Sequence, residues 1–129
     1  MAKRILIVED EAHVLAVIEK RLTTQGYEVL TAMDGREGLR RARSDRPDLI
    51  ILDLILPGID GYQVCSMLKR DAAYRHIPVM MLSARTQHRD IEQGMVVGAD
   101  AYMTKPFQPA ALLKQIAELL EKPQEPRKP

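Results

Sequence analysis

The sequence predicts a doubly wound α/β sandwich, in which a parallel five-stranded sheet carries helices on both faces. Two observations predict this fold class. Apolar runs of strand length alternate with amphipathic runs of helix length five times along the 129 residues, and this alternation is typical of strands joined by crossover helices. The apolar runs are also continuous, which is typical of strands covered on both faces. Right-handed crossovers then give three layers.

Five segments are predicted to be strands. Residues 3–9 and 48–54 are buried apolar runs, and the second of these is the most apolar in the chain. Residues 77–82 form another buried run, residues 27–32 are rich in β-forming residues, and residues 101–104 form a short strand.

The first two helices alternate with these strands. Residues 11–25 carry Leu15, Ile18 and Leu22 at helical spacing, with a glycine stop just beyond. Asp34, with a glutamate three residues later, is a capping-box variant that opens a helix through about residue 44.

The remaining three helices follow the central strand. Asp60 can cap a helix that continues to about Arg70. Residues 86–97 form a weaker helix, because glycines lie within and beside it. Pro109 fits the first turn of the last helix. The apolar positions of that helix are Leu112, Leu113, Ile116, Leu119 and Leu120.

Length and composition predict one domain with a tail. Residues 1–121 are long enough to bury a core of their own. Residues 122–129 are polar and proline-rich, which is typical of an extended tail or linker. No apolar run approaches the roughly 20 residues of a membrane span, and no signal peptide is expected. The single cysteine, Cys65, fits a reducing compartment, so we expect a cytoplasmic protein without membrane contact.

The charge is nearly balanced, with 19 Lys and Arg against 18 Asp and Glu. No global field therefore draws the chain to nucleic acid, and we expect no direct nucleic-acid binding. A local exception lies on the predicted second helix and consists of Arg36, Arg40, Arg41, Arg43 and Arg46. Its ordinary explanation is a solvated helix face, and an acidic partner is the alternative.

Polar side chains of distinct kinds follow or end four of the predicted strands. Glu9 ends the first and Asp10 follows it, Asp53 lies at the end of the third, Ser83 follows the fourth, and Lys105 follows the fifth. Open α/β sheets bind ligands at the carboxyl ends of their strands, so we expect these groups to lie together. Carboxylates suit a hard cation such as Mg²⁺, and an aspartate can form an acyl phosphate. The sequence therefore predicts a site for a divalent cation and a phosphoryl group.

Each of these residues taken alone also has a structural explanation. Asp10 could cap the first helix, and Asp60 is expected to act only as a cap. Ser83 alone would be an ordinary turn residue, and Lys105 a surface lysine. Asp53 is harder to explain, because a charge directly after four apolar residues is costly without a partner.

These motifs resemble the receiver domain of bacterial two-component response regulators, the fold of the chemotaxis regulator. The resemblance covers residues 3 to about 121. The matching segments are residues 5–11, 53–61, 82–84 and 98–107. The resemblance implies a flavodoxin-like sheet with the strand order 2-1-3-4-5.

The resemblance also implies how the site would work. Asp53 would be the phosphoacceptor. Mg²⁺ or Mn²⁺ would be bound directly by Asp10, Asp53 and the backbone carbonyl of Ile55, with Glu9 nearby acting through a water.

Further residues would respond to the phosphoryl group. Ser83 and Lys105 would contact it, and Tyr102 would turn inward as Ser83 moves. Tyr102 is otherwise explained as a half-buried aromatic of an edge strand. The resemblance further implies a cis peptide bond between Lys105 and Pro106.

Some positions depart from the usual family pattern. Ile55 and Arg85 occupy the two positions that tune loss of phosphate, and the apolar Ile55 predicts a longer-lived phosphoryl group. In receivers fused to winged-helix DNA-binding domains, a glutamate and an arginine of the last helix form salt bridges across a dimer. Here Ala111 and Gln115 occupy those positions, so we expect a monomer or a weak phosphorylation-dependent dimer.

The function predicted is a phosphorylation-switched interaction module that catalyses only its own phosphorylation and dephosphorylation. A sensor histidine kinase or a phosphotransfer protein would supply the phosphoryl group. The face of the fourth helix, fifth strand and fifth helix would then change its binding of an output partner. Two alternatives stay open. The chain could be the N-terminal part of a larger regulator with a DNA-binding or enzymatic output domain. It could also be an aspartate-nucleophile phosphohydrolase, although Ile55 stands where such enzymes place a general acid.

Overall fold

Strands and helices alternate strictly along the computed structural model, which describes residues 2–85 and 87–121. The strands are β1 (Arg4–Val8), β2 (Glu28–Ala32), β3 (Leu49–Leu52), β4 (Val79–Ser83) and β5 (Ala101–Thr104). The helices are α1 (Ala12–Thr24), α2 (Gly35–Asp45), α3 (Gly61–Lys69), α4 (His88–Val96) and α5 (Pro109–Glu121). The predicted tail, residues 122–129, lies outside the described residues.

The five strands form one parallel sheet in the order β2-β1-β3-β4-β5. The predicted fold class and strand order are therefore confirmed. Because every strand runs in the same direction, all five carboxyl ends lie along one edge of the sheet.

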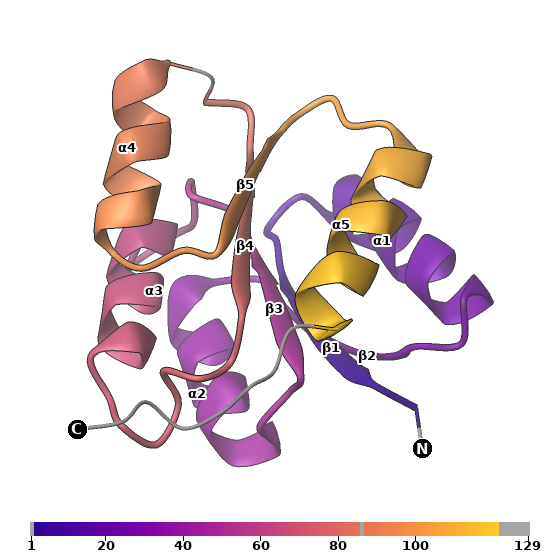
Figure 1. Cartoon of the computed structure of the whole chain (residues 1–129), viewed down its shortest axis with the longest axis horizontal. Helices are drawn as coiled ribbons and strands as arrows, with labels where there is room; N and C mark the ends of the chain where they lie inside the picture. The colour runs from indigo at the N-terminus through magenta and orange to yellow at the C-terminus, as the bar shows by residue number, and fades with distance from the viewer. Residues whose placement is uncertain (1, 86, 122–129) are drawn as a thin grey trace.

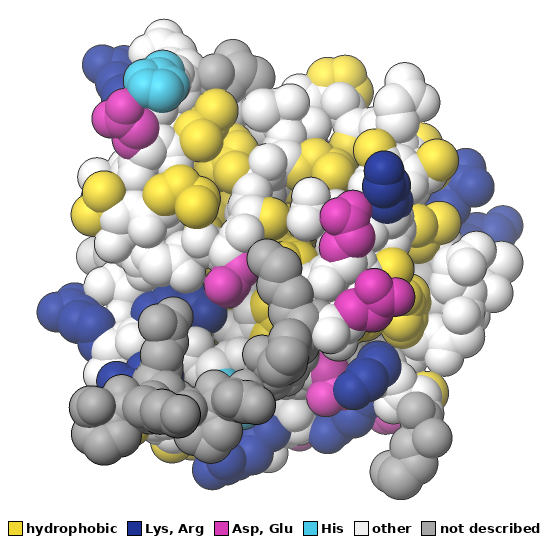
Figure 2. All heavy atoms as spheres, viewed as in Figure 1, with side chains coloured by type: hydrophobic (Ala, Val, Ile, Leu, Met, Phe, Trp, Pro, Cys, Tyr) yellow, Lys and Arg dark blue, Asp and Glu magenta, His cyan; other side chains and the backbone are white. Residues whose placement is uncertain are grey.

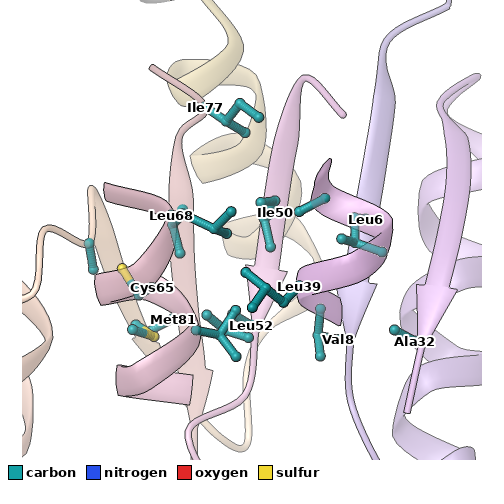
Figure 3. Packing of buried hydrophobic residues seen from close by; sticks show 14 of the residues in the cluster. Leu6, Val8, Ala32, Leu39, Ile50, Leu52, Cys65, Leu68, Ile77 and Met81 are labelled. Atoms are coloured by element: carbon teal, nitrogen blue, oxygen red, sulfur yellow. The ribbon is translucent and has the colours of Figure 1, made fainter. Parts of the chain in front are cut away.

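Helices cover both faces of this sheet, as Figure 1 shows: α1 and α5 lie on one side, and α2, α3 and α4 on the other. Successive residues of a strand point to opposite faces. Accordingly, Leu6 and Val8 join the core under α2 and α3, whereas Ile5 and Ile7 join the core under α1 and α5. Figure 3 shows the first of these cores.

The predicted caps of α2 and α3 are present, and one open alternative is wrong. The Asp34 carboxylate accepts a hydrogen bond from the Glu37 amide at 2.8 Å. Asp60 forms a reciprocal capping box with Gln63, with distances of 2.9 and 3.0 Å. Asp10 does not cap α1, because the N-cap residue is Glu11, which makes no side-chain cap bond. Asp10 is thereby left without a capping role.

Glycines let α2 pack closely against the sheet and the neighbouring loop. A Cβ atom on Gly38 would lie 2.8 Å from Cγ1 of Val8 in β1. A Cβ atom on Gly35 would collide with the backbone carbonyl oxygen of Ile59. The inner side of α2 is thus fitted to backbone and strand, and its outer side is left facing solvent.

At the amino ends of β4 and β5, a lysine joins three segments of the chain. The Lys69 ammonium at the end of α3 donates to the Asp100 carboxylate at 2.9 Å and to the carbonyls of Arg75 and Ile77 at 3.1 and 2.8 Å. The same Asp100 oxygen accepts a hydrogen bond from the Val79 amide at 2.8 Å. These bonds join α3, the start of β4 and the segment before β5.

None of the helices within the described residues combines the length and apolar character that crossing a lipid bilayer requires.

Candidate functional site

Neighbouring strands deliver the predicted acidic residues to one place. Val8 of β1 pairs with Leu52 of β3, so the acidic residues after both strands emerge side by side. The Asp53 amide donates to the carbonyl of Val8 at 3.0 Å, and the Glu9 amide donates to that of Ala32 at 3.0 Å. Backbone hydrogen bonds therefore continue the sheet into the site and fix the backbone positions from which the Glu9 and Asp53 side chains extend.

Three carboxylates form a compact cluster. One oxygen from each of Glu9, Asp10 and Asp53 lies within 4.8 Å of the others. Glu9 and Asp53 are buried, with 2% and 5% exposed, whereas Asp10 is open to solvent. Two of the three carboxylates are thus shielded from solvent, and the third is accessible to it.

Lys105 supplies the opposite charge. Its ammonium donates to Glu9 Oε1 at 2.6 Å and to Asp53 Oδ2 at 3.0 Å. Its amide donates to the carbonyl of Ser83 at 2.8 Å, which ties the loop after β5 to the end of β4. The predicted cis peptide bond between Lys105 and Pro106 is confirmed.

Burial and pairing oppose each other in the electrostatics of this site. Burial raises the pKa of the Glu9 carboxyl and outweighs the hydrogen bond from Lys105 that would lower it. Burial alone would lower the pKa of the Lys105 ammonium, but the hydrogen bonds to Glu9 and Asp53 raise it by more, so its pKa lies above the usual value. Lys105 therefore remains a cation between two carboxylates.

The loop after Asp53 is held tightly. The Ile55 amide donates to Asp53 Oδ1 at 3.3 Å, and the Gly61 amide donates to the carbonyl of Leu54 at 2.9 Å. A Cβ atom on Gly61 would collide with the backbone carbonyl oxygen of Asp53. The start of α3 thus packs directly on the backbone that carries Asp53.

The acidic cluster fits a hard divalent cation. Mg²⁺ binds oxygen at about 2.0–2.1 Å, so opposite ligands lie about 4 Å apart. One oxygen from each of Glu9, Asp10 and Asp53 lies within 4.8 Å of the others, a spacing compatible with groups arranged around one such ion. Oxygen is also the ligand that Mg²⁺ and Mn²⁺ prefer.

Ser83 and Tyr102 lie on neighbouring strands, and both form hydrogen bonds with the backbone of Arg85. Ser83 is fully buried, and its hydroxyl accepts a hydrogen bond from the Arg85 amide at 3.2 Å. The Tyr102 hydroxyl donates to the carbonyl of Arg85 at 2.8 Å. Burial raises the pKa of the partly buried Tyr102 phenol, and a hydrogen bond with the Ser83 side chain opposes this only in part. Arg85 therefore connects the serine to the tyrosine through its backbone.

Sequence reasoning missed two neighbours of this site. Glu11 lies 3.7 Å from the Lys105 ammonium, and its amide donates to Glu9 Oε2 at 3.0 Å. The backbone role of Arg85 was also missed, although the residue itself was noted. Glu11 could have been found from its position directly after Glu9 and Asp10, but a backbone carbonyl leaves no signal in residue type.

A hollow opens beside Lys105, between α1 and the loop that leads to α5. Its volume is about 420 Å³. It is lined by His13, Val14, Val17, Ala84, Lys105, Pro106 and Phe107. A partner entering this hollow would lie next to the acidic cluster.

The fold and the site together define a class of protein. A sequence model of the response regulator receiver domain matches residues 5–117. The chain therefore belongs to the family of receiver domains of two-component response regulators.

Individual relatives agree with this assignment. The alkaline phosphatase synthesis transcriptional regulatory protein PhoP of Bacillus subtilis is 39% identical over 122 residues, which are 95% of this chain and 50% of PhoP. The response regulator PleD of Caulobacter vibrioides is 42% identical over 119 residues, which are 92% of this chain and 26% of PleD. The chain thus spans about half the length of one relative and about a quarter of the other.

A solved structure resembles the whole fold. The CheY-like response regulator receiver domain protein of Methanospirillum hungatei JF-1 superimposes with a TM-score of 0.88 at 30% identity, covering 94% of this chain and 95% of that one.

Proposed function

We propose that Asp53 accepts a phosphoryl group from a phosphohistidine and that this modification switches the chain between two binding states. The observation that carries the proposal is the position of Asp53. Its carboxylate is buried at the carboxyl edge of the sheet, within 4.8 Å of two other carboxylates and 3.0 Å from the Lys105 ammonium.

The transfer itself is a displacement at phosphorus. A carboxylate oxygen of Asp53 attacks the phosphorus atom, and an acyl phosphate bond forms. The bond from phosphorus to the histidine nitrogen breaks, and its electron pair stays with that nitrogen. The Lys105 ammonium can then move from the Asp53 carboxylate to a phosphoryl oxygen, and the Ser83 hydroxyl can donate to another.

Glu9, Asp10, Asp53 and the backbone carbonyl of Ile55 would hold Mg²⁺ or Mn²⁺, with Glu9 acting through a water. When bound, the ion neutralises charge on the three carboxylates and on the incoming phosphoryl group. The carboxylate spacing of at most 4.8 Å supports this part of the proposal.

The output of the switch would be the face formed by α4, β5 and α5. Movement of Ser83 toward the phosphoryl group would release Arg85 and let Tyr102 turn inward, and this biases a two-state element rather than creating a new state. Figure 2 views the molecule from the side of this face and shows hydrophobic side chains over α4. Met95 and Val96, both of α4, are 53% and 78% exposed, as a protein-binding surface requires.

We further propose that residues 1–121 form the receiver domain and residues 122–129 a tail or linker. The length of PhoP and PleD supports the related proposal that such a receiver is joined to an output domain. The phosphodonor would be a sensor histidine kinase or a phosphotransfer protein. A cytoplasmic location belongs to the same proposal, because the one cysteine, Cys65, is a buried free thiol.

Intact-protein mass spectrometry after incubation with acetyl phosphate tests the proposal. We expect one added phosphoryl group on the wild type in the presence of Mg²⁺, and none without Mg²⁺ or on Asp53→Asn. The variant Asp60→Asn changes a carboxylate outside the site and should be phosphorylated like the wild type. An adduct that persists on Asp53→Asn would assign the acceptor to another residue, and no adduct from either acetyl phosphate or a phosphohistidine donor would contradict the proposal.

A further inference from the structure

The outer side of α2 carries a row of arginines. Arg36, Arg40 and Arg43, which we call the arginine stripe, are all exposed. Their spacing of four and three residues places them on one side of the helix. With a rise of 1.5 Å per residue, the stripe is about 10 Å long.

A surface hollow accompanies this stripe. Its volume is about 510 Å³, and it is lined by Arg36, Leu39, Arg40, Arg43 and Ser44. The guanidinium groups therefore border a shallow, open surface against which a side chain of another molecule could lie.

The other two arginines of this segment serve the fold, which sets the stripe apart. Arg41 lies 3.8 Å from the Asp45 carboxylate and donates to the carbonyl of Thr31 at 3.3 Å. The guanidinium of Arg46 lies over the ring of Tyr74, 5.2 Å from its centre. Both side chains contact the chain's own structure.

The stripe has almost no such contacts. Arg40 lies 4.0 Å from the Glu37 carboxylate, at the limit of an ion pair. Across residues 2–85 and 87–121, neither Arg36 nor Arg43 forms an ion pair with a carboxylate. The exposed guanidinium groups are thus available to another molecule.

The stripe also disfavours the helix that carries it. Like charges four residues apart destabilise a helix by a few tenths of a kcal/mol per pair. Arg36 lies in the first turn, where the helix dipole disfavours a cation. The packing of α2 depends on its opposite side, where Gly35 and Gly38 contact the rest of the molecule. Arg43 in the last turn suits the helix dipole, but the fold supplies no reason for Arg36 in the first turn or for the alignment of all three arginines.

The surrounding charge limits what can bind. Residues 35–46 hold five of the 19 basic residues and two of the 18 acidic ones, so the rest of the chain is net acidic. A long polyanion such as duplex DNA, or an anionic membrane, would extend beyond the 10 Å stripe, where the rest of the chain adds no net positive charge. A short acidic segment would not.

We propose that the arginine stripe of α2 docks a short, glutamate- or aspartate-rich segment of a protein partner. Each guanidinium can donate two parallel hydrogen bonds to one carboxylate, which an ammonium cannot do. On binding, three charge-assisted contacts with the partner replace the repulsion between neighbouring arginines. This surface is separate from the carboxyl edge of the sheet and does not depend on the proposed phosphorylation.

Fluorescence anisotropy with a labelled peptide tests this proposal on the full chain. The probe is a glutamate–alanine peptide of about 12 residues, long enough to cover the stripe. We expect saturable binding that weakens as salt is added. The variant Arg36→Gln/Arg40→Gln/Arg43→Gln should bind the peptide at least tenfold more weakly.

The matched control is Lys3→Gln/Lys20→Gln/Arg70→Gln. It removes three exposed basic residues from elsewhere and changes the net charge equally. Its affinity should fall less than threefold. An equal loss in both triple variants would reduce the effect to net charge and overturn the proposal, as would the absence of saturable binding to the wild type.

Two further measurements complete the test. Duplex DNA and vesicles containing anionic lipid are titrated in parallel, and tighter stripe-dependent binding to either would overturn the choice of a protein segment. Thermal unfolding shows whether the stripe serves the fold instead. We expect the midpoint of the stripe variant to equal or exceed that of the wild type, and a lower midpoint would contradict the inference.

Discussion

At the scale of single residues, the positive charge of Lys105 is expected to stabilise the folded state by offsetting the buried carboxylates of the site. We expect Lys105→Met to lower the free energy of unfolding by about 1–3 kcal/mol at neutral pH, because two buried carboxylates lose their partner. The raised pKa of Glu9 means that the loss shrinks as the pH falls through the range where this carboxyl takes up a proton. Urea denaturation at pH 7 and in mild acid measures both effects.

The control for Lys105 is Lys114→Met, since Lys114 is exposed on α5. This variant should change the free energy of unfolding by no more than about 0.5 kcal/mol. Equal stability of Lys105→Met and wild type at neutral pH would show that the carboxylates do not repel one another enough to need the lysine.

Two tyrosines give the molecule a dependence on alkaline pH. Burial raises the pKa of Tyr62 and Tyr102 above 10.0. In the unfolded chain their phenols lose protons near pH 10, while the folded chain still holds them. Their contribution to stability is thus complete below pH 10 and is lost as the pH rises through the folded pKa values.

Absorbance at 295 nm follows the ionisation of the four tyrosines. We expect a late-titrating fraction in the wild type that becomes smaller in Tyr102→Phe. Tyr62→Phe should also make that fraction smaller, because burial raises the pKa of Tyr62 too. If Tyr102→Phe removed only early-titrating absorbance, the buried environment assigned to Tyr102 would be wrong.

We expect Ile55 to limit the access of water to Asp53 in the proposed phosphorylated state. Its side chain is 53% exposed, and it follows Asp53 by two residues. An apolar group here hinders the water that would attack the acyl phosphate, whereas a polar group could orient it. We therefore expect Ile55→Asn to shorten the lifetime of the phosphorylated protein by several-fold. Mass spectrometry over time measures it, and loss of phosphate from the wild type within seconds would contradict the expectation.

The close packing of α2 is tested at the scale of elements. Alanine favours a helix over glycine by about 1 kcal/mol, but a Cβ atom on Gly38 would lie 2.8 Å from Val8. Since the clash forces α2 away from β1, we expect Gly38→Ala to lower the free energy of unfolding by about 1–3 kcal/mol. Urea denaturation measures the change. Ser44→Ala, at an exposed position of α2, should be nearly neutral, and a stabilised Gly38→Ala would show that the helix can shift without cost.

The elements themselves could be predicted because their signals are local. Each helix and strand shows its own periodicity or cap, as Asp60 and Gln63 do for α3. The contact between Gly38 and Val8 could not be predicted in this way, because the two residues belong to different elements. The same holds for Lys69 and Asp100, which are 31 residues apart and form an ion pair without any local pattern.

The carboxyl edge of the sheet could be predicted at the scale of the whole molecule. Parallel strands place their ends together, so Glu9, Asp53 and Lys105 could be grouped from sequence alone, and the structure brings them into contact. The side-chain and backbone hydrogen bonds at this edge could not be predicted from the sequence. Ser83 and Tyr102 both bind the backbone of Arg85, and backbone partners depend on conformation rather than on residue type.

The sheet also determines how the two cores respond to mutation. Ile77 belongs to the core under α2 and α3, and Ile116 to the core under α1 and α5. Each is at most 2% exposed, so Ile77→Val and Ile116→Val should each lower the free energy of unfolding by about 0.5–1.5 kcal/mol. Because the sheet separates the two sites, the double variant should show the sum within about 0.5 kcal/mol.

The same strands line both cores, however, so neither core can unfold while the other stays intact. We therefore expect one cooperative transition in urea, with coincident fluorescence and circular dichroism curves, for the wild type and all three variants. Tyrosine emission reports on tertiary packing here because the chain contains no tryptophan. Two separate transitions would show that the sheet does not join the two cores into one cooperative unit. A loss in the double variant that differs from the sum by more than about 1 kcal/mol would show that the packing of the two cores is not independent.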